Sequence, residues 1–206
     1  SYTADTAIKN GMFTLSMPQN TPEGTYRLVY AVPQDEYYFD LIYNGKEEIK
    51  LNFNIEQGVV FTESKENILF STYFEKIHAI EQELIAFYSK NMTDTSAFNT
   101  IIEKYHSVQK LYEKKSENLL TNHFIKANKS YVPTRFEPVQ EFVKKRKESF
   151  FDHLDLSNLI LQSSAFLTEK LTNYVFTALP LGELTSSEIE IEMQANIDEV
   201  VKNLEG

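Results

Sequence analysis

The spacing of hydrophobic residues changes once along the chain, between residues 62 and 64. Up to Phe61, hydrophobic and polar positions alternate with a period of two in short stretches, which is typical of half-buried β-strands. From Ser64 onward, hydrophobic residues return every three or four positions, which indicates amphipathic helices. The pattern therefore predicts an α+β protein, with an antiparallel β-domain at residues 1–63 and a helical region at residues 64–206.

Turn signals divide the first region into about six short strands. The dipeptide Asn10-Gly11 favours a type I′ hairpin turn between strands at residues 3–9 and 12–17. Asn44-Gly45 predicts a second hairpin, which joins the strands at residues 37–43 and 49–55. The remaining strands are expected at residues 26–30 and 59–62. Short antiparallel strands with closely spaced turns predict a small β-sandwich, whose N-terminus is expected to be truncated.

The second region is predicted to form about five or six helices. Ser64 is a candidate N-cap for the first, and Thr185 with Glu188 forms a capping box at the start of the last. Pro138 suits the first turn of a helix, and Pro180 with Gly182 ends another. The expected helices lie at residues 64–87, 94–119, 122–129, 138 onward, 164–178 and 185–204.

Composition excludes several classes of protein. The chain has 206 residues with 30 acidic and 20 basic side chains, a net charge of −10, which argues against a nucleic-acid partner. The acidic excess lies at the two ends, since residues 1–62 carry 8 acidic and 4 basic residues and residues 183–206 carry 7 and 1. The absence of cysteine excludes disulfides, thiolate metal sites and cysteine nucleophiles. No apolar run approaches the roughly 18 to 20 residues that a membrane span needs.

Few residues are candidates for chemistry. The four histidines lie in separate segments and lack the spacing of a helical metal site. Asp152, His153 and Asp155 form the one local cluster that could ligate a metal or act as acid and base. The hydrophobic residues around them favour a loop with capping aspartates instead. We therefore predict no catalytic residue, no metal and no cofactor, and a chain that is not an enzyme.

Two groups of residues are candidates for binding. The basic run at residues 144–147 would suit a phosphate or an anionic lipid, although glutamates on the same predicted helix favour a solvated face. Tyr37, Tyr38 and Tyr43 crowd one predicted strand, where alternate side chains face opposite ways. One subset of these tyrosines is a candidate interaction surface, while half-buried packing is the favoured interpretation.

The order of four groups of residues resembles a known family. The groups are Gly11-Met12-Phe13 with residues 22–28 and Asn44-Gly45; Ser64, Glu66, Asn67, Phe70 and Tyr73; residues 150–157; and Leu167, Lys170, Leu171 and Tyr174. Together they resemble the β-domain and helical part that precede the thioredoxin domain in thioredoxin-like thiol:disulfide oxidoreductases of Gram-negative envelopes. In that family these are scaffold residues, so the resemblance implies no catalytic role for them.

The chain also departs from that family. With no cysteine and no tryptophan, the Trp-Cys-x-x-Cys active site of the thioredoxin domain is missing. Since the chain also begins without methionine, it is expected to be a fragment of a longer protein of the periplasm or cell envelope, or a short natural form.

Three functions follow from these observations. The first is a non-catalytic accessory region that positions protein clients, or dimerises, next to the missing thioredoxin domain, where tethering raises local concentration. The second is a stand-alone envelope module in which the tyrosines of residues 37–43 bind a glycan or a peptide. The third is a hydrolase that uses Asp152, His153 and Asp155, which requires these side chains to meet at one pocket.

Overall fold

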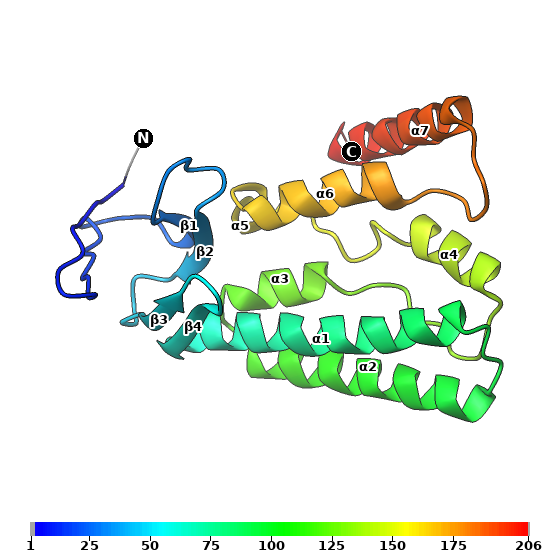
Figure 1. Ribbon diagram of the computed structural model, residues 1–206, viewed down its shortest axis with the longest axis horizontal. Coiled ribbons are helices and arrows are strands. Elements are labelled where there is room, and N and C mark those ends of the chain that lie inside the picture. Colours follow the sequence, from blue (N-terminus) through cyan, green and yellow to red (C-terminus); the bar gives the residue numbers. More distant parts are fainter. Residues whose placement is uncertain (1–2, 206) are drawn as a thin grey trace.

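The computed structural model describes residues 3–205 and shows a mixed α+β fold (Figure 1). Four strands come first within these residues, and seven helices follow. The strands lie at one end of the molecule, and the long helices α1 and α2 run side by side away from them (Figure 1). The bounds are β1 Gly24–Val29, β2 Tyr38–Tyr43, β3 Lys50–Asn54, β4 Gly58–Glu63, α1 Lys65–Ser89, α2 Thr95–Lys115, α3 Thr121–Ala127, α4 Val139–Glu148, α5 Leu159–Gln162, α6 Ala165–Thr177 and α7 Ser186–Glu205.

The strands form two separate two-stranded antiparallel sheets, and the described residues contain no β-sandwich. β1 pairs with β2, with Gly24 opposite Tyr43, and β3 pairs with β4, with Asn54 opposite Gly58. Four strands of five or six residues offer too few positions to enclose a core between two facing layers. The centre of β2 instead buries Ile42 among helical side chains.

The prediction of two strands at residues 3–9 and 12–17 is wrong. A single bridge between Lys9 and Met12 is found there, around Asn10 and Gly11, which both have positive φ. The turn therefore forms where Asn10-Gly11 predicts it, but the flanking residues have no third strand to pair with. An isolated hairpin is marginal in water, and Met12 remains 71% exposed.

The hairpin predicted at Asn44-Gly45 is also wrong, because β2 and β3 belong to different sheets. The Asn44 side chain accepts hydrogen bonds from the backbone N–H groups of Lys46 and Glu47, at 3.0 and 3.2 Å. This Asx turn redirects the chain after β2 rather than folding it back beside the same strand.

The predicted helices are confirmed in position and, in several cases, in their capping. Ser64 accepts a hydrogen bond from the Asn67 N–H at the start of α1. At α7 the backbone N–H of Thr185 donates to Glu188 and the N–H of Glu188 donates to the Thr185 hydroxyl, which completes the capping box. The short α5 was not predicted, since four residues are too few to show a helical period.

Two hydrophobic clusters hold the helices together. The larger one lies between α1, α2 and α3 and is centred on the buried rings of Tyr73 and Phe98. The second joins β2 to α3, α5 and α6, with Ile42, Phe124 and Leu161 at its centre. Ile42 therefore ties the strand region to the same core as the helices.

A buried polar junction connects the strands to the start of α1. The Asn67 side-chain amide donates to the Ile42 carbonyl and accepts from the Ile42 N–H, both at 2.8 Å. It therefore provides hydrogen-bond partners for both backbone groups of Ile42 in β2. The Glu47 carboxylate accepts hydrogen bonds from the Ser64 hydroxyl and the Lys65 N–H at the N-terminus of α1.

Glu66 extends the junction to α3. Its carboxylate, 1% exposed, accepts hydrogen bonds from the backbone N–H groups of Leu120 and Thr121, at 3.0 and 2.9 Å, and from the Thr121 hydroxyl at 2.7 Å. α3 has no capping side chain of its own, so Glu66 caps it from another helix.

In the part of the chain that the structure describes, no helix combines the length and the apolar character that a membrane-spanning helix requires.

Candidate functional site

A cavity of about 500 Å³ lies among α1, α4, α6 and the segment that follows α3. α4 and α6 supply most of its wall, Glu81 of α1 reaches it, and residues 128–131 close another side. Phe142, Phe150 and Phe166 give the cavity an apolar surface. Its volume lies within the range of roughly 300 to 1,000 Å³ that small-molecule sites occupy.

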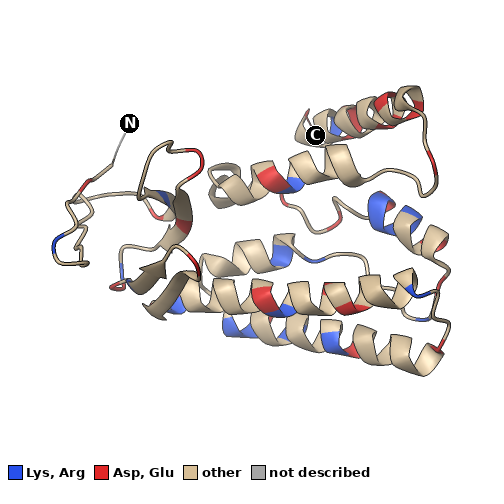
Figure 2. Ribbon diagram, in the orientation of Figure 1, with Lys and Arg blue, Asp and Glu red and all other residues tan. Residues whose placement is uncertain are grey.

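The charge of this cavity is opposite to that of the whole chain. Its lining includes four basic side chains and two acidic ones, Lys129, Arg146, Lys147 and Lys170 against Glu81 and Glu169. The chain as a whole carries −10. A concave surface with a local positive excess attracts anions even when the molecule repels them at a distance. Figure 2 shows the basic residues of α4 gathered toward its C-terminal end.

Lys170 is the most unusual residue of the cavity. Its side chain is half-buried, and its ammonium lies 5.2 Å from the centre of the Phe150 ring. Among the described residues the ammonium has no hydrogen-bond acceptor and no ion-pair partner. Burial and the nearby Arg146 lower the pKa of Lys170 to about 8, and Glu81 offsets this shift in part. An amine in a cavity, with a pKa lowered by burial and by a neighbouring charge, is a candidate functional group.

The guanidinium of Arg146 uses only part of its hydrogen-bonding capacity within the protein. Its Nη2 donates to the Glu81 carboxylate at 3.2 Å, which holds the side chain against α1. A guanidinium has five N–H donors, so most of its hydrogen-bonding capacity remains for a ligand in the cavity. Lys147 is held differently, because its ammonium pairs with Glu192 of α7 at 3.0 Å.

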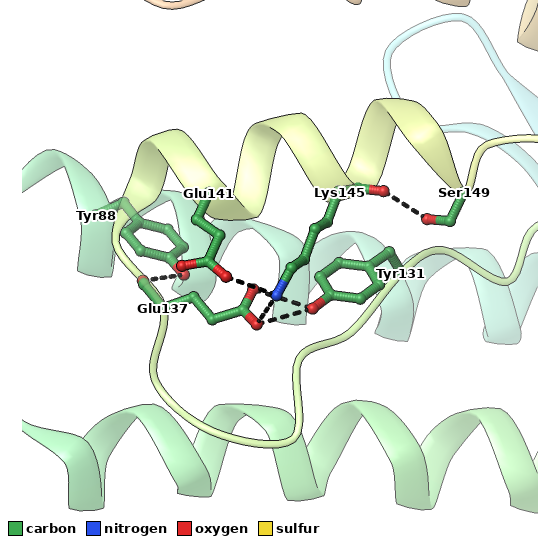
Figure 3. A network of polar contacts seen from close by, with 6 residues as sticks. All are labelled: Tyr88, Tyr131, Glu137, Glu141, Lys145 and Ser149. Carbon is green, nitrogen blue, oxygen red and sulfur yellow. Dashed lines mark hydrogen bonds and ion pairs between the residues drawn. The ribbon is translucent and has the colours of Figure 1, made fainter.

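A network of polar contacts fixes α4, and with it Arg146, against the rest of the molecule (Figure 3). The Lys145 ammonium binds the buried carboxylate of Glu137 and, at 2.7 Å, that of Glu141. The Tyr131 hydroxyl donates to Glu137 at 3.0 Å, and the Tyr88 hydroxyl donates to the backbone carbonyl of Glu137 at 3.2 Å. Figure 3 shows these side chains converging under one face of α4. The next residue, Arg146, is thereby directed to the cavity.

The basic run at residues 144–147 is therefore not simply the solvated face that the sequence favoured. Only Lys144 has a largely solvated side chain, at 74% exposure, and pairs with Glu148 on the same helix. Lys145, Arg146 and Lys147 each contact an acidic residue from outside α4. The run joins α4 to three other parts of the fold, and two of its members line the cavity.

The predicted interaction candidates Tyr37, Tyr38 and Tyr43 do not line this cavity. Tyr37 is 38% exposed and contacts Tyr30 edge-on, with 6.0 Å between ring centres. The Arg27 guanidinium lies 3.5 Å from the centre of the half-buried Tyr38 ring. Tyr43, also half-buried, packs edge-on against Tyr26. Each ring therefore contacts another side chain within residues 26–43.

Asp152, His153 and Asp155 are exposed and lie outside the cavity. Asp155 accepts hydrogen bonds from the backbone N–H and the hydroxyl of Ser157, and these bonds lower the pKa of its carboxyl group. The described residues contain no group of three or more histidine and acidic side chains placed to hold a metal. Asp155 is thus a turn-capping aspartate, as the sequence favoured.

Lys170 was missed as a binding residue, although the sequence contains a signal for it. On α6 it lies three residues after Leu167 and four before Tyr174, both of which are buried. This spacing places a lysine within the inward-facing stripe of an amphipathic helix. A charged residue at such a position needs either a partner or a function.

No protein-family model, no curated protein and no solved structure matches the chain. The resemblance to the N-terminal region of thioredoxin-like oxidoreductases, and the envelope localisation drawn from it, therefore remain predictions.

Proposed function

We propose that the chain is a binding module that holds a small organic anion, a carboxylate, in the cavity between α4 and α6. The observation that carries this proposal is the half-buried Lys170 ammonium, which has no acceptor within the described residues. A half-buried cation with no directly paired anion costs free energy, and a bound carboxylate would lower that cost. The proposal belongs to the binding-module class predicted from the sequence, with a different site from the tyrosines.

The apolar wall favours an organic anion over inorganic phosphate. Phe150 and Phe166 would cover the carbon atoms of a ligand, while Lys170 and Arg146 bind its carboxylate. Asn128, Ser130 and Asn173 add uncharged polar groups to the same lining. A few polar groups on a mainly apolar surface are the usual composition of a small-molecule site.

Titration of the ¹⁵N-labelled protein with pyruvate, succinate and inorganic phosphate tests this proposal. We expect the two carboxylates to shift the amide signals of cavity residues saturably. Lys170→Gln removes one charged hydrogen bond, worth about 1.5 to 3 kcal/mol, and should weaken binding at least about tenfold. Lys170→Arg keeps the charge and should bind within a few-fold of the wild type.

Lys144→Gln is the matched control, because it removes a lysine from the same region whose side chain is 74% exposed and lies outside the cavity. It should leave the affinity unchanged. The proposal is wrong if the carboxylates shift no cavity signals, or if Lys170→Gln and Lys144→Gln have equal effects.

A further inference from the structure

The surroundings of Lys170 suit a second property beyond charge, which is nucleophilicity. A lysine attacks a carbonyl carbon only as the neutral amine, so it needs an environment that releases its proton. The two best-attested environments are an apolar pocket and the neighbourhood of another cation. Lys170 has both, because its half-buried side chain lies in a cavity lined by Phe142, Phe150 and Phe166, and Arg146 lines the same cavity.

Lys145 provides a contrast within the same molecule. Its ammonium is held by two carboxylates, Glu137 and Glu141, and these contacts raise its pKa above the usual value. That ammonium is committed to ion pairs and stays protonated. Lys170 has no such anchor, and its pKa of about 8 leaves roughly a tenth of the amine neutral at pH 7.

The cavity also has the other parts that a carbonyl substrate requires. Its volume of about 500 Å³ accommodates a small acid beside the lysine. Arg146 on the facing helix is available for the carboxylate, since a single hydrogen bond at 3.2 Å ties it to Glu81. The carboxylate of a 2-oxo acid is adjacent to its carbonyl, so a cation that binds the first also positions the second.

We propose that Lys170 forms an imine with a small 2-oxo carboxylate bound in the cavity between α4 and α6. The lone pair of the neutral Nζ forms a bond to the carbonyl carbon, and the carbonyl oxygen takes up a proton to give a carbinolamine. A second proton transfer lets this oxygen leave as water, and the carbon–nitrogen double bond forms. Overall, one ammonium and one ketone give one protonated imine and one water, with no change in oxidation state. This inference rests on the proposed binding function and specifies its ligand class.

Reductive trapping tests the imine. The intact protein is incubated with pyruvate and sodium cyanoborohydride, which reduces an imine to a stable secondary amine, and the modified lysine is located by peptide mass spectrometry. We expect a single carboxyethyl group on Lys170, formed at least about tenfold faster than on any other lysine. Succinate, which has no ketone, should compete with the labelling.

Lys170→Arg separates the imine from simple binding, because arginine keeps the positive charge but forms no such imine. This variant should still bind pyruvate in the titration and should lose the rapid labelling. Saturable binding of pyruvate without selective labelling of Lys170 would overturn the imine and leave the binding function intact. If neither binding nor selective labelling occurs, both proposals are wrong.

Discussion

Replacing Glu66 with alanine is expected to destabilise the fold by about 2 to 6 kcal/mol, because two backbone N–H groups lose their acceptor at a cost of about 1 to 3 kcal/mol each. The carboxylate accepts three hydrogen bonds from Leu120 and Thr121, and two of these donors are the free N–H groups at the start of α3. Alanine removes the acceptor of both N–H groups, whereas the Thr121 hydroxyl can still donate to the backbone carbonyl of residue 66, at 2.9 Å in the wild type. Since total stabilities are about 5 to 15 kcal/mol, this single change should remove a large fraction of the free energy of unfolding.

Urea denaturation of the variant measures the effect. Glu66→Gln retains one acceptor oxygen and should fall between the wild type and Glu66→Ala. Glu75→Ala is the matched control on the same helix, because Glu75 is exposed, and it should change the free energy of unfolding by less than about 0.5 kcal/mol. A loss below about 1 kcal/mol for Glu66→Ala would show that water or rearrangement satisfies α3 without the carboxylate.

The Glu66 junction also affects the candidate site. α3 begins at the residues that Glu66 caps, and it leads directly into residues 128–131, which line the cavity. Loosening the start of α3 should therefore weaken carboxylate binding indirectly, even though Glu66 itself does not contact the cavity.

Replacing Lys170 with methionine is expected to stabilise the protein at pH 7 by about 1 to 3 kcal/mol. The pKa of Lys170 is lower in the folded protein, about 8, than the ordinary lysine value of 10.5. Below pH 8 the folded protein must keep a poorly solvated ammonium, so the full cost is present there. Between pH 8 and 10.5 the folded state loses this proton before the unfolded state does, so the cost disappears as the pH rises.

The stability difference between Lys170→Met and the wild type should therefore be largest at or below pH 7 and should approach a small constant value near pH 10.5. Using the difference between two proteins removes the contribution of the tyrosines, which titrate alike in both. The charged groups around the cavity are Glu81 on α1, Lys129 after α3, Arg146 and Lys147 on α4, and Glu169 on α6.

Lys126→Met on α3 is the matched control, because this lysine is exposed and lies outside the cavity. Its effect on stability should be small at every pH. A difference between Lys170→Met and the wild type that is independent of pH would contradict the lowered pKa of Lys170. Residues of functional sites often lower the stability of the fold, so that replacing them raises the free energy of unfolding.

The helices were predictable because their signals are local. The stripe that includes Tyr73 and Ile77, and the caps at Ser64 and Thr185, depend on residues three or four positions apart. The predicted strands that correspond to β1 to β4 were also found near their expected positions. Their pairing was not predictable, since a strand that alternates polar and hydrophobic residues pairs equally well with several others.

Less of the candidate site than of the fold could be predicted from the sequence. Arg146 and Lys147 attracted attention as a basic run, but their acidic partners, Glu81 and Glu192, lie 65 and 45 residues away in the sequence. In the sequence, Lys170 was noted only as one of the scaffold residues of the family resemblance. Its importance depends on Phe150 and Arg146, which come near it only in the folded protein, where α4 and α6 line the same cavity.

The sequence by itself determined where the longer helices lie, that strands and turns come before Ser64, and that cysteine chemistry is absent. These properties follow from the conformational preferences of neighbouring residues and from composition. Only the tertiary structure decided that the strands form two small sheets, that Glu66 caps α3, and that Lys170 lies in a cationic cavity. Each of these depends on burial and on charges brought together from distant segments, and a local sequence pattern does not encode which segments meet.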